Sequence, residues 1–241
     1  MTDAAQKSSL LFLDFDGTIS ERDAIDAILE AFADPRWLSI EEEWKAGRIG
    51  SRACLKEQIE LVRATREELD ALLDSIELDE GLNVLLQTCA SHQIPTHVIS
   101  DGFDYCINRI LARRANDFVQ RSLHVRASHL EPEGAHRWRT DFPFFHQACA
   151  HGCATCKPAV MSLLNNTGAA TIFVGDGLSD RYAAASADLV FAKNSLAAYC
   201  REVQIPYVAY DHLGDVAAHL ETALRLGTDF TTREQIERVG A

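Results

Sequence analysis

The sequence has no hydrophobic run of about 18 residues, the length that a membrane-spanning helix requires. Its first nine residues are mostly polar, with only Met1, Ala4 and Ala5 apolar. The apolar stretch 10–13 is too short for the core of a secretory signal. We therefore expect no membrane span and no membrane partner. The expected location of the protein is the cytoplasm.

Basic residues are few, because 23 lysines and arginines stand against 36 aspartates and glutamates, a formal net charge of −13. Surfaces that bind nucleic acid are rich in lysine and arginine, which neutralise phosphates. No nucleic-acid partner is therefore predicted. A phosphate ester is still an acceptable substrate, since one lysine and one divalent cation can reverse the field inside a cleft.

The seven cysteines are an odd number and are mostly scattered, which does not indicate a disulfide framework. One group is denser, because Cys149, Cys153 and Cys156 lie in one short run with His146 and His151. This spacing leaves two interpretations open, a structural zinc site or free thiols in an ordered loop. The run has no second, distant pair of ligands, which favours the thiols.

The chain alternates short apolar runs with segments of helical spacing, without internal repeats or a low-complexity linker. Apolar runs typical of buried parallel strands cover 10–15, 96–100, 171–176, 189–192 and 207–210. Helical spacing occupies 82–89, 103–112, 159–164, 180–187, 196–203 and 216–224. The predicted fold class is α/β, with a Rossmann-like parallel-sheet core that binds ligands at the carboxyl ends of its strands.

Two segments interrupt this alternation. Residues 21–79 contain only helical patterns, such as the apolar spacing of Ile25, Ile28 and Leu29. We interpret 21–79 as a helical cap inserted after the first strand, and 1–20 together with 80–241 as the α/β core. Residues 118–142 indicate a short antiparallel excursion.

Asp14 and Asp16 lie at the end of the first predicted strand, ahead of Gly17 and Thr18. Residues i and i+2 of a strand point to the same side, so the two carboxylates can converge. Such a pair suits phosphoryl transfer, because one carboxylate can attack phosphorus or bind a metal while the other handles protons. The alternative is a pair of surface acids at a strand end.

A second acidic group follows the predicted strand 171–176. Glycines flank Asp176 and let the backbone approach a ligand, and Asp180 begins the next predicted helix. Asp14, Asp176 and a backbone carbonyl would supply the oxygen ligands that Mg²⁺ prefers. Taken alone, Asp180 also fits a helix N-cap or a first-turn acid.

Two more polar positions precede predicted helices. Ser100, with the backbone amides that follow it up to Gly102, can form a cradle for an anion. Lys157 lies before a proline and a helix and offers a compact cation for phosphate. Taken alone, Ser100 fits a helix cap and Lys157 a solvated side chain.

In their order along the chain, these positions resemble the four motifs of phosphatases of the haloacid-dehalogenase superfamily, over about residues 9–210. The motifs are Asp14-x-Asp16-Gly17-Thr18, Ser100, Lys157 and Gly175-Asp176-x-x-x-Asp180. In having a second aspartate in the first motif, the sequence resembles the phosphatase branch of the superfamily. In having a helical insert directly after that motif, it resembles the phosphoserine-phosphatase-like subclass.

The resemblance implies hydrolysis of a small phosphorylated metabolite through an aspartyl-phosphate. Asp14 would be the nucleophile, and Asp16 would act as general acid and then as general base. Ser100, the amide of Gly102 and Lys157 would hold the phosphoryl oxygens.

The resemblance also implies Mg²⁺ as the cofactor. Its ligands would be Asp14, Asp176 and the carbonyl of Asp16. Asp180 would orient Lys157 or a metal-bound water. Nothing in the sequence predicts an oligomeric state.

A narrower likeness points to one branch. The segments 32–37, 94–104, 153–158 and 190–193 resemble the methionine-salvage phosphatases, which act on 2-hydroxy-3-keto-5-methylthiopentenyl-1-phosphate. Where phosphoserine phosphatases carry a cap-side glutamate for the substrate ammonium, this sequence has the shorter Asp23. Alternatives that stay open are phosphoserine, phosphoethanolamine or phosphocholine as substrate, transfer to another alcohol, and a catalytically silent binding protein.

The cap residues that contact the substrate are harder to predict. Asp23 and Arg52 are the predicted substrate-binding residues. Lys56 and Gln58 lie on the same predicted helix as Arg52 and could reach the substrate, although a solvated helix face is the alternative for each. Trp37 and Trp44 are predicted to pack in the core of the cap.

Overall fold

The computed structural model describes residues 8–228 and residue 230 of the chain. A seven-stranded sheet with the order β4-β3-β2-β1-β5-β6-β7 forms the centre. Every neighbouring pair is parallel except β3 with β4, so the predicted α/β class and parallel core are confirmed. The strands are β1 (Ser9–Leu13), β2 (Thr96–Phe103), β3 (His124–Glu133), β4 (Arg137–Asp141), β5 (Ala170–Gly175), β6 (Leu189–Ala192) and β7 (Val208–Ala209).

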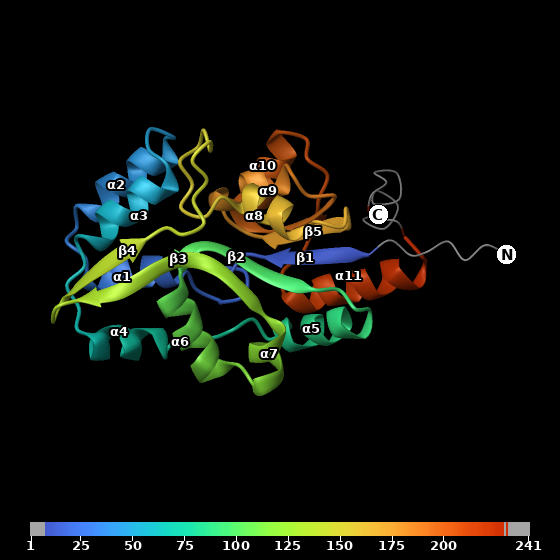
Figure 1. Ribbon diagram of the computed structural model, residues 1–241, viewed down its shortest axis with the longest axis horizontal. Coiled ribbons are helices and arrows are strands. Elements are labelled where there is room, and N and C mark those ends of the chain that lie inside the picture. The colour runs from blue at the N-terminus through green and yellow to red at the C-terminus, as the bar shows by residue number, and fades with distance from the viewer. Residues whose placement is uncertain (1–7, 229, 231–241) are drawn as a thin grey trace.

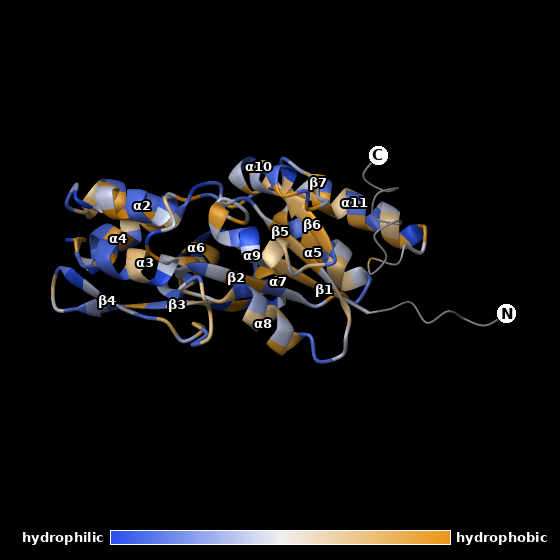
Figure 2. Cartoon of the chain, turned by 90° about the horizontal axis from the view of Figure 1, so that it is seen from above, coloured by the Kyte–Doolittle hydropathy of each residue, from blue (hydrophilic) through white to orange (hydrophobic). Residues whose placement is uncertain are grey.

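Helices cover both faces of the sheet (Figure 1). One face carries α5 (Leu82–Ser91), α6 (Asp104–Arg114), α7 (Asp117–Ser122) and α11 (Leu213–Arg225), and the other carries α8 (Lys157–Leu164), α9 (Arg181–Ala184) and α10 (Asn194–Glu202). Successive strand residues point to opposite faces, so Leu11 and Leu13 of β1 join one hydrophobic cluster while Leu10 and Phe12 join a second. Figure 2 shows the resulting concentration of hydrophobic residues along β5 and β6.

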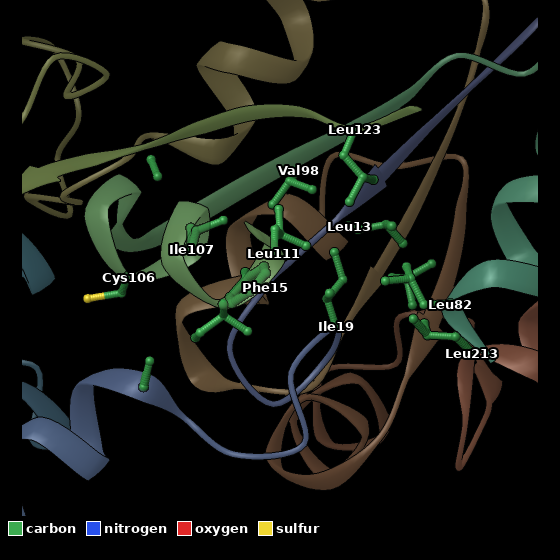
Figure 3. Packing of buried hydrophobic residues seen from close by; sticks show 14 of the residues in the cluster. Leu13, Phe15, Ile19, Leu82, Val98, Cys106, Ile107, Leu111, Leu123 and Leu213 are labelled. Atoms are coloured by element: carbon green, nitrogen blue, oxygen red, sulfur yellow. The ribbon is translucent and has the colours of Figure 1, made fainter. Parts of the chain in front are cut away.

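The larger cluster fixes the chain where β1 ends. Figure 3 shows Leu13 and Val98 packed together with Leu111 of α6, and Phe15 and Ile19 lie in the same cluster. Phe15 is completely buried, and its burial contributes about 1.5–3 kcal/mol. Because Phe15 points into this cluster, the residues before and after it, Asp14 and Asp16, are directed to the other side.

Residues 21–79 form α1 (Ala24–Phe32), α2 (Trp37–Lys45), α3 (Ser51–Ile59) and α4 (Arg66–Leu73). The four helices gather at one end of the molecule, beyond the carboxyl end of β1 (Figures 1 and 2). The chain enters and leaves them side by side, because Ser20 and Leu78 form an antiparallel bridge. This pairing supports the proposed division into a cap of residues 21–79 and a core.

The segment 118–142 contains more structure than the predicted antiparallel excursion. It contains α7, and β3 first pairs in parallel with β2 and only then antiparallel with β4. The β3–β4 hairpin also supports the cap, since the indole Nε1 of Trp138 donates to the carbonyl of Ala64 at 3.0 Å. The antiparallel excursion is therefore confirmed, but it belongs to the central sheet as well.

Other boundaries move by a few residues. β2 continues to Phe103, so α6 begins one residue later than predicted. The helix predicted at 180–187 is a 3-10 turn, Leu178–Asp180, followed by the single turn of α9. In the part of the chain that the structure describes, no helix is long and apolar enough to cross a membrane.

Candidate active site

The carboxyl ends of three neighbouring strands bring the predicted catalytic residues together. β1 lies between β2 and β5, and Asp14 follows β1 directly, with its N–H donating to the carbonyl of Val174 at 3.0 Å. Asp176 follows β5, and Ser100 lies in the last part of β2. Three residues that are far apart in sequence therefore meet at one edge of the sheet.

Lys157 is a buried cation between two carboxylates. Its side chain is 2% exposed, and its Nζ lies 2.9 Å from Oδ1 of Asp14 and also contacts Oδ1 of Asp180. Burial works against the ammonium form, but the charges of Asp14, Asp180 and Asp101 raise the pKa of Lys157 above its usual range. Lys157 begins α8, whose second residue is Pro158, so the proline locates the lysine at the helix start.

Asp180 uses both carboxylate oxygens within the protein. Oδ1 accepts from Lys157, and Oδ2 accepts from the backbone N–H groups of Asp176 and Gly177, each at 3.1 Å. Asp180 is fully buried. Its position thus fits the orienting role toward Lys157 that the resemblance implied.

A cation site at Asp14 and Asp176 fits the chemistry of the residues present. Ligand oxygens of Asp14, Asp176 and Asp180 lie within 4.8 Å of one another. Among the described residues, Oδ1 of Asp14 has no hydrogen bond of good geometry, despite the nearby ammonium. Burial first, and then the charge of Asp180, raise the pKa of both Asp14 and Asp176. A divalent cation held by oxygen ligands would relieve this repulsion.

Asp16 lies beside Asp14 and against the β2 segment. Its Oδ1 accepts from the N–H of Ala24 at 2.9 Å. Burial raises the pKa of Asp16 to about 6, while the bond from Ala24 lowers it. A Cβ at Gly102 would lie 2.4 Å from Oδ2 of Asp16, so a larger residue there would displace the Asp16 carboxylate. The N–H of Gly102 donates to Oγ of Ser100 at 2.9 Å, whereas the resemblance implied that this amide holds a phosphoryl oxygen.

Gly17 has a comparable steric role. Its φ is +71°, and a Cβ would lie 2.5 Å from Oδ2 of Asp176. The glycine of the first motif therefore permits both the left-handed turn and the close approach of the Asp176 carboxylate.

A cavity of about 270 Å³ lies between these residues and the cap. Its core side carries the predicted groups Asp14, Asp16, Gly17, Ser100, Gly102 and Asp176. Its cap side carries Asp23, Ile25, Asp26, Glu41, Trp44, Lys45, Leu55 and Gln58. Both parts of the chain thus line one chamber.

Of the cap residues predicted to reach the substrate, only some line the cavity. Asp23 lines the cavity and also caps α1, where its Oδ1 accepts from the N–H groups of Ile25 and Asp26 at 2.8 and 3.0 Å. Arg52 is not among the lining residues; its guanidinium lies over the ring of Phe145, 4.5 Å from the centroid. Gln58 is buried and lines the cavity, while Lys56 is exposed.

Sequence reasoning missed part of the cap wall. Trp37 packs against the hydrophobic core as predicted, but Trp44 lines the cavity instead. Glu41, which no motif indicated, accepts from Nε2 of Gln58 at 2.9 Å and pairs with Lys45 at 3.3 Å. The i, i+4 spacing of Glu41 and Lys45 was the one available signal, and it equally fits an exposed helix pair.

The structure brings two thiols of the cysteine run close together. Cys149 and Cys153 approach to 3.6 Å between sulfur atoms. Within residues 8–228 and 230, however, the only set of three or more mutually close candidate ligands is the aspartate set of the cavity. The run forms part of the loop that precedes Lys157.

Two relatives that match nearly the whole chain have the same name. A 2-hydroxy-3-keto-5-methylthiopentenyl-1-phosphate phosphatase of Geobacillus thermodenitrificans (strain NG80-2) is 28% identical over 227 residues, which cover 90% of this chain and 97% of that protein. The protein of the same name from Bacillus pumilus (strain SAFR-032) is 26% identical over 219 residues, with 89% and 92% covered.

Solved structures show the same fold. A phosphoserine phosphatase captured as a phospho-aspartyl intermediate analogue has a TM-score of 0.65 at 17% identity, covering 91% of this chain and 99% of that chain. A haloacid-dehalogenase-family hydrolase from Salmonella enterica serovar Typhi has a TM-score of 0.66 at 19% identity, covering 88% and 71%.

The family itself is shown by the sequence match. The family model of haloacid dehalogenase-like hydrolases matches residues 11–185, which is well over half of the chain. The matched range contains Asp14, Ser100, Lys157, Asp176 and Asp180, the residues that carried the resemblance. The chain belongs to the haloacid dehalogenase-like hydrolase family.

Proposed function

We propose that this protein is a magnesium-dependent phosphomonoesterase in which Asp14 is the nucleophile. The observation that carries the proposal is the buried pair of Asp14 and Lys157, 2.9 Å apart, beneath a cavity that Asp16 and Asp176 also line. Asp14 attacks phosphorus, and Asp16 protonates the departing oxygen and then takes a proton from the water that hydrolyses the aspartyl-phosphate.

The other residues position and neutralise the phosphoryl group. Lys157 and the hydroxyl of Ser100 hold phosphoryl oxygens, and Asp180 keeps the ammonium of Lys157 in place. Asp14, Asp176 and the carbonyl of Asp16 would hold Mg²⁺, which supplies positive charge against the phosphoryl oxygens. The amide of Gly102 would join them once the substrate competes with Ser100 for its hydrogen bond.

For the substrate we propose 2-hydroxy-3-keto-5-methylthiopentenyl-1-phosphate. Relatives with this activity in their name match about nine tenths of the chain. The cap wall offers apolar surface from Ile25, Trp44 and Leu55 that suits a methylthio group, and the amide of Gln58 suits a keto oxygen.

A second candidate is a phosphate ester that carries an amine, such as phosphoethanolamine or phosphoserine. Its support is the charge of the cap wall, where Asp23, Asp26 and Glu41 face one lysine, Lys45. An ammonium group would be stabilised by such a wall, even with the short side chain of Asp23. We prefer the methionine-salvage ester as the substrate because the relatives that match about nine tenths of the chain carry that activity in their names.

A panel of small phosphate esters, assayed with Mg²⁺ and again after chelation, tests these proposals. We expect the methionine-salvage ester to have the highest kcat/KM, with phosphoserine, phosphoethanolamine and phosphocholine well below it. Activity should disappear with the chelator and return when Mg²⁺ is added. A higher kcat/KM for an amine ester would contradict the substrate, and hydrolysis that survives rigorous metal removal would contradict the metal.

The same panel separates the remaining alternatives. A protein that only binds would hydrolyse none of the esters. A phosphotransferase would give a new ester when a candidate alcohol is present. We expect free phosphate to equal the ester consumed.

A further inference from the structure

Asp101 joins three segments that surround the cavity. It follows Ser100 near the end of β2, and its Oδ2 accepts from Oγ of Ser51, the first residue of cap helix α3, at 2.5 Å. Its Oδ1 accepts from the N–H of Thr155 at 2.9 Å. The N–H of Ala154 in turn donates to Oγ of Ser51 at 3.0 Å, so the hydrogen bonds form a closed set.

The loop that Asp101 contacts is itself pressed between cap and core. The carbonyl of Gly152 accepts from the N–H of Arg52 at 3.1 Å. The ring of His151 stacks on Tyr182, with the centroids 3.7 Å apart. A Cβ at Gly50 would lie 2.4 Å from the carbonyl oxygen of Gly152, so the two backbones touch.

The residues joined in this way are the neighbours of the reacting groups. Asp101 is next to Ser100, and Thr155 is two residues before Lys157. From Ser51 onward, α3 supplies Cys54, Leu55 and Gln58 to the cavity wall. A displacement of α3 would therefore open the chamber where the substrate lies.

We propose that Asp101 is a positioning residue that holds cap helix α3 closed over the phosphate-binding edge of the sheet. We call Asp101, Ser51, Ala154 and Thr155 the Asp101 latch. This inference rests on hydrolysis of a phosphate monoester at this site, and it does not depend on which ester is the natural one.

The latch needs a carboxylate. Two donors, the hydroxyl of Ser51 and the N–H of Thr155, converge on Asp101, and each takes a separate oxygen. An asparagine has one acceptor oxygen, so its NH₂ group would face one of these donors. Asp101→Asn thus changes little volume and still breaks the latch.

Amide hydrogen exchange in α3, without substrate, tests the latch directly. We expect exchange in α3 to rise about tenfold in Asp101→Asn and in Ser51→Ala, because a buried hydrogen bond to a charged group contributes that much to an opening equilibrium. Ser51→Thr keeps the hydroxyl and should match the wild type. Asp188→Asn is the matched control, since its Oδ2 accepts from the N–H and the hydroxyl of Thr171, which lies in β5 of the core.

Kinetics with p-nitrophenyl phosphate and Mg²⁺ give a second readout. In Ser51→Ala we expect KM to rise about five- to tenfold with a smaller change in kcat. Inhibition by inorganic phosphate, which we expect to bind the core groups Lys157 and Ser100, should change by less than about twofold. The combined effect of Asp101→Asn and Ser51→Ala should fall short of the product of the two single effects, because both changes remove the hydrogen bond between Ser51 and Asp101.

Three outcomes would overturn the proposal. The first is amide exchange of α3 at the wild-type rate in both Asp101→Asn and Ser51→Ala. The second is a Ser51→Thr variant that behaves like Ser51→Ala. The third is a double variant in which the two single effects on exchange and KM multiply. If Asp101→Asn does not fold, the Ser51→Ala and Ser51→Thr pair gives the same decision. Failure of the methionine-salvage ester in the panel would leave these measurements unaffected.

Discussion

At the scale of single residues, the site places one cation among several acids. Asp14 and Asp180 contact Lys157 directly. The charge of Asp101 also acts on Lys157, and weaker interactions link Lys157 to Asp16 and Asp176. Taking such charges out of water is unfavourable unless each has a partner. Burying these charges therefore does not stabilise the fold. The phosphoryl chemistry that we propose for the site explains why they lie together.

The role of Asp14 can be tested with a nearly isosteric change. Asp14→Asn should fold and retain less than about 1% of wild-type hydrolysis, because an amide is not a nucleophile toward phosphorus. Steady-state assays with p-nitrophenyl phosphate measure it. Asp34→Asn, which alters an acid distant from the cavity, should stay within about twofold of the wild type. Activity of several per cent in Asp14→Asn would rule out the covalent route.

The pKa of Asp16 predicts how the metal-free protein responds to pH. Burial raises this pKa from its ordinary value to about 6. The folded state therefore holds a proton that the unfolded state releases earlier, so the contribution to stability is complete below the ordinary pKa and is lost as the pH rises through about 6.

Urea unfolding in the presence of a chelator measures this effect. Relative to Asp16→Asn, the wild type should lose about 1–1.5 kcal/mol as the pH rises from about 5 to about 7.5. Parallel pH curves for the two proteins would show that Asp16 does not titrate in this range.

At the scale of elements, the β3–β4 hairpin ties the cap to the sheet. Trp138 is 5% exposed, packs edge-on against Tyr105 and donates to the carbonyl of Ala64. We expect Trp138→Ala to cost about 3–5 kcal/mol and Trp138→Phe about 1 kcal/mol.

Both Trp138 variants should also expose the cap to limited proteolysis within residues 21–79. Leu163→Ala, at a side chain that is 76% exposed, should change the free energy of unfolding by less than about 0.5 kcal/mol. Proteolysis of the tryptophan variants at the wild-type rate would contradict the proposed support of the cap by the hairpin.

At the scale of the whole molecule, the chamber between cap and core predicts a small substrate. Cap and core both line a cavity of about 270 Å³, which suits a metabolite, and we expect it to exclude a folded phosphoprotein or a polynucleotide. The net charge of −13 adds repulsion toward nucleic acid. We expect kcat/KM on phosphopeptides and polynucleotides to lie at least about a thousandfold below that on the best small ester. Efficient release of phosphate from a phosphoserine peptide would contradict a closed cap.

The sequence could predict the positions that depend on local patterning. Apolar runs located β1, β2 and β5, and the carboxyl ends of parallel strands share one edge of a sheet. That rule predicts that Asp14, Ser100 and Asp176 lie together, and the order of β2, β1 and β5 in the sheet agrees with it. The cap could be predicted as helical because its apolar spacing is helical throughout.

Only the tertiary structure decided how the cap meets the core. Arg52 lies on Phe145 while Glu41 and Trp44 face the cavity, because the face that a cap helix turns inward depends on contacts with distant segments. The same holds for Asp180, whose bond to Lys157 requires α8 and the turn after β5 to meet. Local propensity fixes which residues form an element, whereas packing between elements fixes what each side chain touches.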